Sequence, residues 1–229
     1  MKQIKTSLSL LLVIFSLLLF YSCSKSSSNG GNSGTTTTTP LFPLKVNNSW
    51  YYKLKAYDTT TGTVLDSSYF TLTITGTVSE NGNTYYQFQN STSSNQTLIA
   101  ALNSTTLGTV DSAYGINYHT FFVSGTGDST QSITSWPDSV NTNGTTCEGT
   151  DKLYAYYADT TLINEDGIVY ANSIKNIIVT YNCSGGKYTA SVYFVKPGLG
   201  LVRYALYVYS PAGVPQLYLA WVLESETLN

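Results

Sequence analysis

Apolar and polar residues alternate along most of the chain after residue 40, which is the pattern of half-buried strands. The clearest segment is 70–78, where Phe70, Leu72 and Ile74 alternate with threonines as far as Gly76. An Asn-Gly turn follows at residues 81–82, and residues 84–89 are expected to form a second strand antiparallel to the first. The two segments together predict a β-hairpin.

The same pattern predicts further strands, and the linkers between the last four are short. Short linkers make consecutive strands antiparallel neighbours. Residues 160–178 come closest to a helical period, but the β-branched run at 177–179 favours a strand. Residues 124–150 are rich in Gly, Ser, Thr and Asn and are expected to form a long excursion. The further strands are expected at 49–57, 97–102, 117–123, 152–158, 174–182, 187–196, 200–209 and 216–224.

About ten strands over residues 41–229 predict an all-β fold. We expect a single antiparallel domain with a strongly curved sheet, either a half-barrel or a barrel. A sandwich of two antiparallel sheets is the alternative, because alternation alone does not show how a sheet closes.

The N-terminus carries an export signal. Lys2 and Lys5 precede an apolar run at residues 8–20, which is too short to span a bilayer comfortably and fits a signal peptide. The small Ser22 before Cys23 resembles a bacterial lipobox, so residues 1–22 are predicted to be a lipoprotein signal peptide and Cys23 the lipidated residue. An ordinary secretory signal with cleavage nearby is the alternative.

Residues 23–40 are predicted to be the lipidated cysteine and a flexible tether rich in Ser, Thr and Gly, because no large apolar side chain follows Cys23 there. The lipid would anchor the domain, residues 41–229, to the outer membrane. Residues 24–26 read Ser-Lys-Ser and lack the acidic residues typical of surface-directed lipoproteins in one group of Gram-negative bacteria. This favours the periplasmic face over the cell surface.

Two cysteines remain after Cys23, and an exported protein meets an oxidising compartment. We therefore predict a disulfide between Cys147 and Cys183, which lie 36 residues apart. Two unpaired buried thiols are the alternative.

Composition excludes several kinds of function. Charged residues make up 10% of the chain and the net charge is −2, which argues against nucleic acid as a partner. The sequence has a single histidine, His119, and lacks the Gly-x-Ser-x-Gly motif that carries the nucleophile of a serine hydrolase. One histidine and two paired cysteines cannot supply the four ligands of a zinc site. We therefore expect no catalytic site, metal or cofactor. Carboxylates that could still meet in a cleft for glycan hydrolysis or calcium binding are Asp138, Glu148, Asp151, Glu165 and Asp166.

Tyrosine is abundant, with 20 residues, and many lie on predicted strands. Rings aligned on one exposed face bind sugars, peptides or lipids, whereas cross-strand packing is the structural alternative. The candidate aromatic binding surface comprises Tyr52, Tyr86, Tyr154, Tyr156 and Tyr207.

A short motif of Asp, then Ser or Thr, then a small or aliphatic residue or Thr occurs five times. It resembles the O-glycosylation sequon of exported proteins in one group of Gram-negative bacteria. Asp-Ser and Asp-Thr also simply form turns, which leaves a second interpretation open. The candidate acceptors are Thr59, Ser112, Ser129, Ser139 and Thr160.

Three longer strings resemble a group of secreted bacterial lipoproteins of unknown function. Residues 42–52 resemble its opening Phe-Pro-Leu-Lys-x-Gly-Asn-x-Trp-x-Tyr, residues 170–178 its Pro-Ala-Gly-Thr-Phe-x-Asn-Val-Ile, and residues 193–203 its closing Tyr-Tyr-Ala-x-Gly-Val-Gly-Leu-Val-Lys. Asn47 and Asn172 stand at the group's glycines, and asparagine tolerates positive φ. The resemblance implies a relative of the half-barrel LolA-type lipoprotein carriers, although those carriers also have helices that plug the barrel.

The sequence therefore predicts a non-enzymatic cell-envelope lipoprotein with a binding or carrier domain. Its partners would be the membrane, through the N-terminal lipid, and a lipid, glycan or protein ligand. The alternatives are a glycan-binding or glycan-active surface protein, or a structural or adhesive lipoprotein. A concave cavity near Phe70, Leu72 and Ile74 would favour a carrier, and a pair of facing acids would favour an enzyme.

Overall fold

The computed structural model describes residues 39–80, 82–93, 96–103, 105–111, 117–124, 131–142, 145–155, 160–163 and 166–229. All regular elements in these ranges are strands, and all paired strands are antiparallel. The strands are β1 (Ser49–Tyr57), β2 (Val64–Glu80), β3 (Asn83–Asn90), β4 (Gln96–Asn103), β5 (Thr106–Asp111), β6 (Asn117–Val123), β7 (Thr134–Thr142), β8 (Thr145–Ala155), β9 (Thr160–Ile163), β10 (Val169–Tyr181), β11 (Lys187–Lys196), β12 (Gly200–Tyr209) and β13 (Pro215–Thr227).

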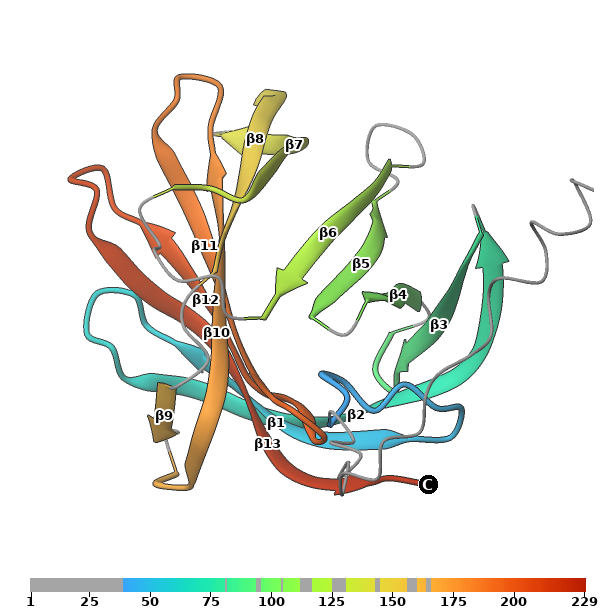
Figure 1. Cartoon of the computed structure of the whole chain (residues 1–229). Coiled ribbons are helices and arrows are strands. Elements are labelled where there is room, and N and C mark those ends of the chain that lie inside the picture. Colours follow the sequence, from blue (N-terminus) through green and yellow to red (C-terminus); the bar gives the residue numbers. More distant parts are fainter. Residues whose placement is uncertain are drawn as a thin grey trace, which may run out of the picture. The chain divides into compact units, whose positions relative to one another are not determined.

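The strands form one sheet in the order β6-β5-β4-β3-β2-β1-β13-β12-β11-β10-β8-β7, and β9 pairs with β10 outside this order. Strands β1, β2 and β13 form the base, with β10 to β12 rising on one side and β3 to β6 on the other (Figure 1). The sheet is therefore strongly curved, as predicted. The alternative of a sandwich is wrong, because a single continuous sheet folds round to face itself.

One stretch of the expected organisation needs correction. Residues 134–142 and 145–150 do not form an irregular excursion, because β7 pairs with β8 from Thr134 to Thr142 without a register shift. The inward residues Trp136 and Val140 are buried, but the polar residues around them hide the alternation in the sequence. Pro137 is compatible with β7 because this strand lies at the end of the strand order, where one edge needs no partner.

Aromatic residues near the start of the domain join the base of the sheet to the turn between β11 and β12. Trp50 Nε1 donates a hydrogen bond to the Leu199 carbonyl, and the Tyr52 hydroxyl donates to the Leu201 carbonyl, both at 2.7 Å. The Phe42 ring lies against Gly200, where an added Cβ would meet the ring at 2.9 Å. Two of the three strings from the sequence are thus in direct contact, although 149 residues separate each hydrogen-bonded pair.

Asn47 and Asn172 are the residues other than glycine that adopt positive φ in the described part of the chain, with φ of 72° and 57°. An L side chain in this region brings its Cβ close to backbone oxygen, which is costly for most residues but less so for asparagine. The two positions that stand at glycines in the resembling group thus have the backbone conformation that favours glycine.

We expect Asn47→Ala to lower the free energy of unfolding by about 1 kcal/mol and Asn47→Gly to leave it unchanged or raise it. The Asn47 side chain is exposed, so the backbone conformation should dominate the effect. Urea denaturation of the two variants measures the difference, with exposed Lys45→Ala as the control. Equal stability of the alanine and glycine variants would contradict the expectation.

Candidate functional site

A cavity of about 460 Å³ lies inside the curved sheet. Its lining comes from strands on both sides, and most of it is aromatic or aliphatic. Such a volume and lining are typical of sites for small apolar molecules. The apolar lining residues are Phe42, Leu72, Phe88, Ile99, Leu107, Phe121, Phe122, Trp136, Ile178, Val195, Leu201 and Trp221.

The cavity also has polar side chains, among them Asp151 of β8, Ser191 of β11 and Tyr204 of β12. The Ser191 and Tyr204 hydroxyls are 3.1 Å apart. Burial raises the pKa of Tyr204 and of the neighbouring Tyr193, and Asp151 adds a smaller increase for Tyr193. Both tyrosines therefore remain neutral phenols at ordinary pH and keep a hydroxyl proton to donate.

Side chains rather than a backbone ladder join β6 to the opposite side of the sheet. The Val123 amide donates to Asn176 Oδ1, and Asn176 Nδ2 donates to the Val123 carbonyl, both at 2.9 Å. The Asn176 carboxamide thus replaces the paired backbone groups of a neighbouring strand. Val123 also packs with Trp136, Leu153 and Ile178, a cluster that brings β6, β7, β8 and β10 together.

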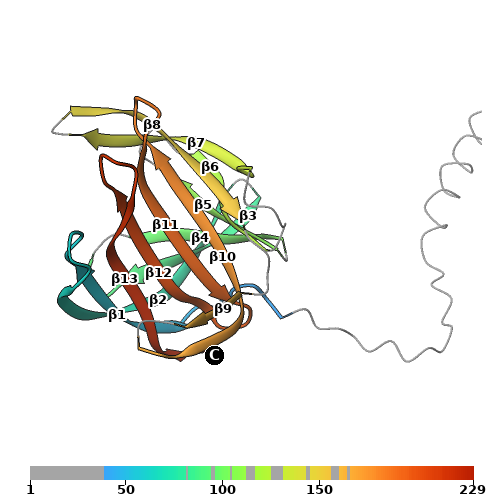
Figure 2. The same ribbon diagram turned by 90° about the vertical axis from the view of Figure 1, so that its left-hand side faces the viewer.

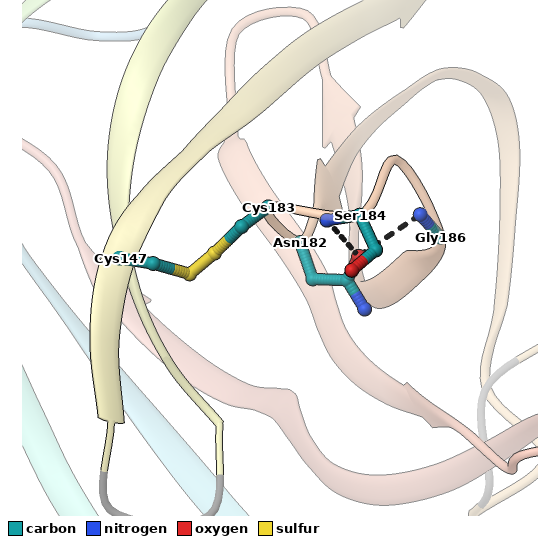
Figure 3. The surroundings of a disulfide bond; sticks show 5 residues. All are labelled: Cys147, Asn182, Cys183, Ser184 and Gly186. Carbon is teal, nitrogen blue, oxygen red and sulfur yellow. Dashed lines mark hydrogen bonds between the residues drawn. A yellow bond between two sulfur atoms is a disulfide. The ribbon is translucent and has the colours of Figure 1, made fainter.

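The predicted disulfide is present. Cys147 of β8 is bonded to Cys183, which lies in the turn after β10, and their Cα atoms are 6.1 Å apart (Figure 3). Asn182 Oδ1 orders this turn by accepting from the amides of Ser184 and Gly186 at 3.0 and 2.9 Å. The bridge therefore joins one end of β8 to an ordered turn.

The structure divides the candidate tyrosines. Tyr52 is fully buried and hydrogen-bonded inside the base, so its assignment to an exposed surface is wrong. Tyr86 is half-buried against the core, and Tyr156 lies outside the described residues. Tyr154 and Tyr207 line the same hollow on the outer face, because their strands, β8 and β12, are separated only by β10 and β11 in the sheet. Alternation identified these strands but not which face would be buried.

The candidate carboxylates are distributed over different surroundings. Asp138 and Asp151 lie on the same face of the β7–β8 hairpin, whereas Glu148 lies on the other face and is exposed. Asp166 Oδ1 is 2.8 Å from the buried Lys55 Nζ, and this hydrogen bond is the main reason that the pKa of Asp166 is lowered. Asp166 thus stabilises a buried cation. Glu165 lies outside the described residues.

Two further groups of sequence candidates are only partly described. Thr59 lies in a turn where Asp58 Oδ1 accepts from the amides of Thr60 and Thr61, both at 2.8 Å, as the turn interpretation of the motif expects. O-glycosylation stays a prediction. Cys23, Ser112 and Ser129 lie outside the described residues, and the structure places only the backbone of His119 in β6, Ser139 in β7 and Thr160 in β9.

Over the described ranges, no three His, Cys, Asp or Glu side chains are grouped so that they could hold a metal ion. The same ranges contain no helix long and apolar enough to cross a membrane. The described residues do form two hollows, the apolar cavity inside the sheet and the one on its outer face.

The fold and the cavity define an all-β domain with one strongly curved antiparallel sheet. The sequence matches no protein-family model, and no curated protein is similar to it. Among solved structures, the chain is similar to a proposed lipoprotein from Parabacteroides distasonis, with 13% identity over 82% of this chain and 99% of that chain, at a TM-score of 0.48. It is also similar to a proposed exported protein with a YmcC-like fold from Bacteroides fragilis, with 10% identity over 81% and 98% of the two chains, at a TM-score of 0.45.

Proposed function

We propose that this protein is a non-enzymatic, lipid-anchored protein of the cell envelope whose β-domain holds an apolar ligand inside its curved sheet. The observation that supports this function is the cavity of about 460 Å³ with its largely aromatic and aliphatic lining. Filling such a space with an apolar molecule removes apolar surface from water, which is favourable by about 25 cal/mol for each Å².

The polar part of the lining limits which ligands fit. Asp151, Ser191 and the two neutral phenols of Tyr193 and Tyr204 place polar groups in a lining that is largely apolar. Buried polar groups stabilise a complex only when they find partners. An apolar body with one hydroxyl or amino group therefore suits the cavity better than a pure hydrocarbon.

Binding of the apolar fluorophore N-phenyl-1-naphthylamine tests this function. Ile99 lines the cavity, and Ile99→Trp should fill part of it and weaken binding by about tenfold or more. Leu98 precedes Ile99 on the same strand and does not line the cavity, so Leu98→Trp is the matched control. A fluorophore that fails to bind the wild type, or binds both variants equally, would exclude the proposal.

The membrane anchor is tested separately by Cys23→Ser. Without the thiol no lipid can be attached, so the protein should move from the membrane pellet to the soluble fraction. An acyl chain contributes about 0.8 kcal/mol for each buried CH₂ group, so its loss should change the distribution strongly. A variant that still sediments with membranes would show that Cys23 is not the anchor.

A further inference from the structure

The outer face of β8, β10, β11 and β12 carries a hollow of about 490 Å³. Figure 2 shows β10, β11 and β12 side by side on the face turned toward the viewer. Small or branched residues form the floor, where Val179, Ala190 and Val192 are buried. Tyr154 and Tyr207 line the hollow from β8 and β12. We call this feature the outer groove.

The strand register arranges the outer groove in rows. Ile177 pairs with Tyr154 on one side and with Val192 on the other, and Ala190 in the next row pairs with Tyr207. A floor of smaller residues between two tyrosines leaves room for a ligand to lie against aromatic faces.

Cations stand at both ends of the outer groove. At one end, Lys175 and Arg203 pair with Phe194 from either side and lie 6.0 and 5.7 Å from its ring centroid. At the other end, Lys187 of the lining lies 5.7 Å from the Tyr209 ring. Lys152 is not part of the lining, but it lies 4.8 Å from the ring of Tyr181, which is. Tyr181 lies six positions after Lys175 on β10, so the two ends are about 20 Å apart.

This concentration of positive charge contrasts with the net charge of −2 for the whole chain. Asp and Glu are missing from the described residues that line the outer groove. Burial lowers the pKa of Lys175, and the neighbouring charge of Arg203 lowers it further. An anionic group placed between the two side chains would offset this repulsion and form charge-assisted hydrogen bonds with both.

We propose that the outer groove binds an anionic polysaccharide, with its sugar rings against the tyrosines and its acidic groups held by the cations at the two ends. The chemistry of the groove carries this inference, because aromatic faces and spaced cations match a chain that alternates apolar ring faces with negative charge. Nucleic acid fits less well, since its affinity depends on a basic excess that this chain lacks. The inference is independent of the cavity.

Isothermal titration calorimetry with hexagalacturonate and with a sulfated dextran oligosaccharide tests the inference. The fully methyl-esterified galacturonate and the unsulfated dextran are the uncharged controls. At least one charged oligosaccharide should bind, its uncharged parent should bind at least about tenfold more weakly, and salt should weaken the binding. Failure of both charged oligosaccharides to bind would overturn the inference.

Two pairs of substitutions locate the site. Lys152→Gln with Lys187→Gln should weaken binding by about tenfold or more. Lys45→Gln with Lys53→Gln is the control, because it removes the same charge and Lys53 also lies over a tyrosine, 6.0 Å from the Tyr69 ring. Equal weakening by the two pairs would overturn the assignment to the outer groove.

Further measurements separate loss of binding from loss of folding, and the proposed ligand from other anions. Urea denaturation of each variant shows whether it is folded, and Tyr207→Leu, which removes the aromatic face but leaves the charges, should also weaken binding. Vesicles of phosphatidylglycerol and a single-stranded oligonucleotide serve as alternative anions. The vesicles or the oligonucleotide could bind more tightly than both oligosaccharides and lose that binding in the Lys152 and Lys187 variant. This result would overturn the proposed ligand.

Discussion

Replacing Asn176 by alanine is expected to lower the free energy of unfolding by about 2–4 kcal/mol, because two buried backbone groups lose their partners. The amide and the carbonyl of Val123 both bond to the Asn176 carboxamide, which is fully buried. The Asn176 side chain is the partner in both bonds, so the alanine variant leaves the Val123 donor and acceptor without these hydrogen bonds. Urea denaturation measures the loss.

A second measurement separates this bond pair from general packing. Hydrogen exchange of the Val123 amide should become much faster in the alanine variant, because its acceptor is gone. Asn103→Ala is the control, since exposed Asn103 accepts hydrogen bonds from the backbone and hydroxyl of Thr105 in the adjoining turn. A loss below about 0.5 kcal/mol for Asn176→Ala would contradict the assigned role.

Removing the disulfide by replacing both Cys147 and Cys183 with serine should cost about 4 kcal/mol, because the chain between them gains freedom in the unfolded state. The bond closes a loop with a separation of 36 residues, and that loop includes β8, β9 and β10. The measurement is urea denaturation of the oxidised wild type and of the double variant.

Two controls accompany this experiment. Alkylation of the unfolded, unreduced mature protein should find no free thiol. Reduced wild-type protein should unfold at about the same urea concentration as the double variant, since both lack the bond. Equal stability of the oxidised protein and the double variant would show that the bridge does not stabilise the domain.

The sequence predicted the strands well wherever alternation was regular and turns were short. Strands β1, β6, β11 and β12 have the expected boundaries. Strand β5 was not expected, because Gly108 interrupts its apolar pattern. The Leu102 side chain of the neighbouring strand lies over this glycine, 2.9 Å from where a Cβ would be, a contact between strands that the local pattern does not reveal.

The candidate sites were less predictable than the strands. Leu72 lines the cavity, as the carrier hypothesis expected, but Phe70 and Ile74 pack in the core instead. That Tyr154 and Tyr207 line the same outer groove depends on the order of four strands, which the sequence does not show. Asn176 did leave a signal, since an asparagine surrounded by isoleucines is unusual inside a strand.

The first and last strands of the domain are neighbours, and their pairing lies in the middle of the strand order. During synthesis, β1 has its second partner only when the residues of β13 have appeared, after all the other strands of the described sheet. Long-range pairing of this kind makes folding slow and leaves the growing chain unable to complete its sheet.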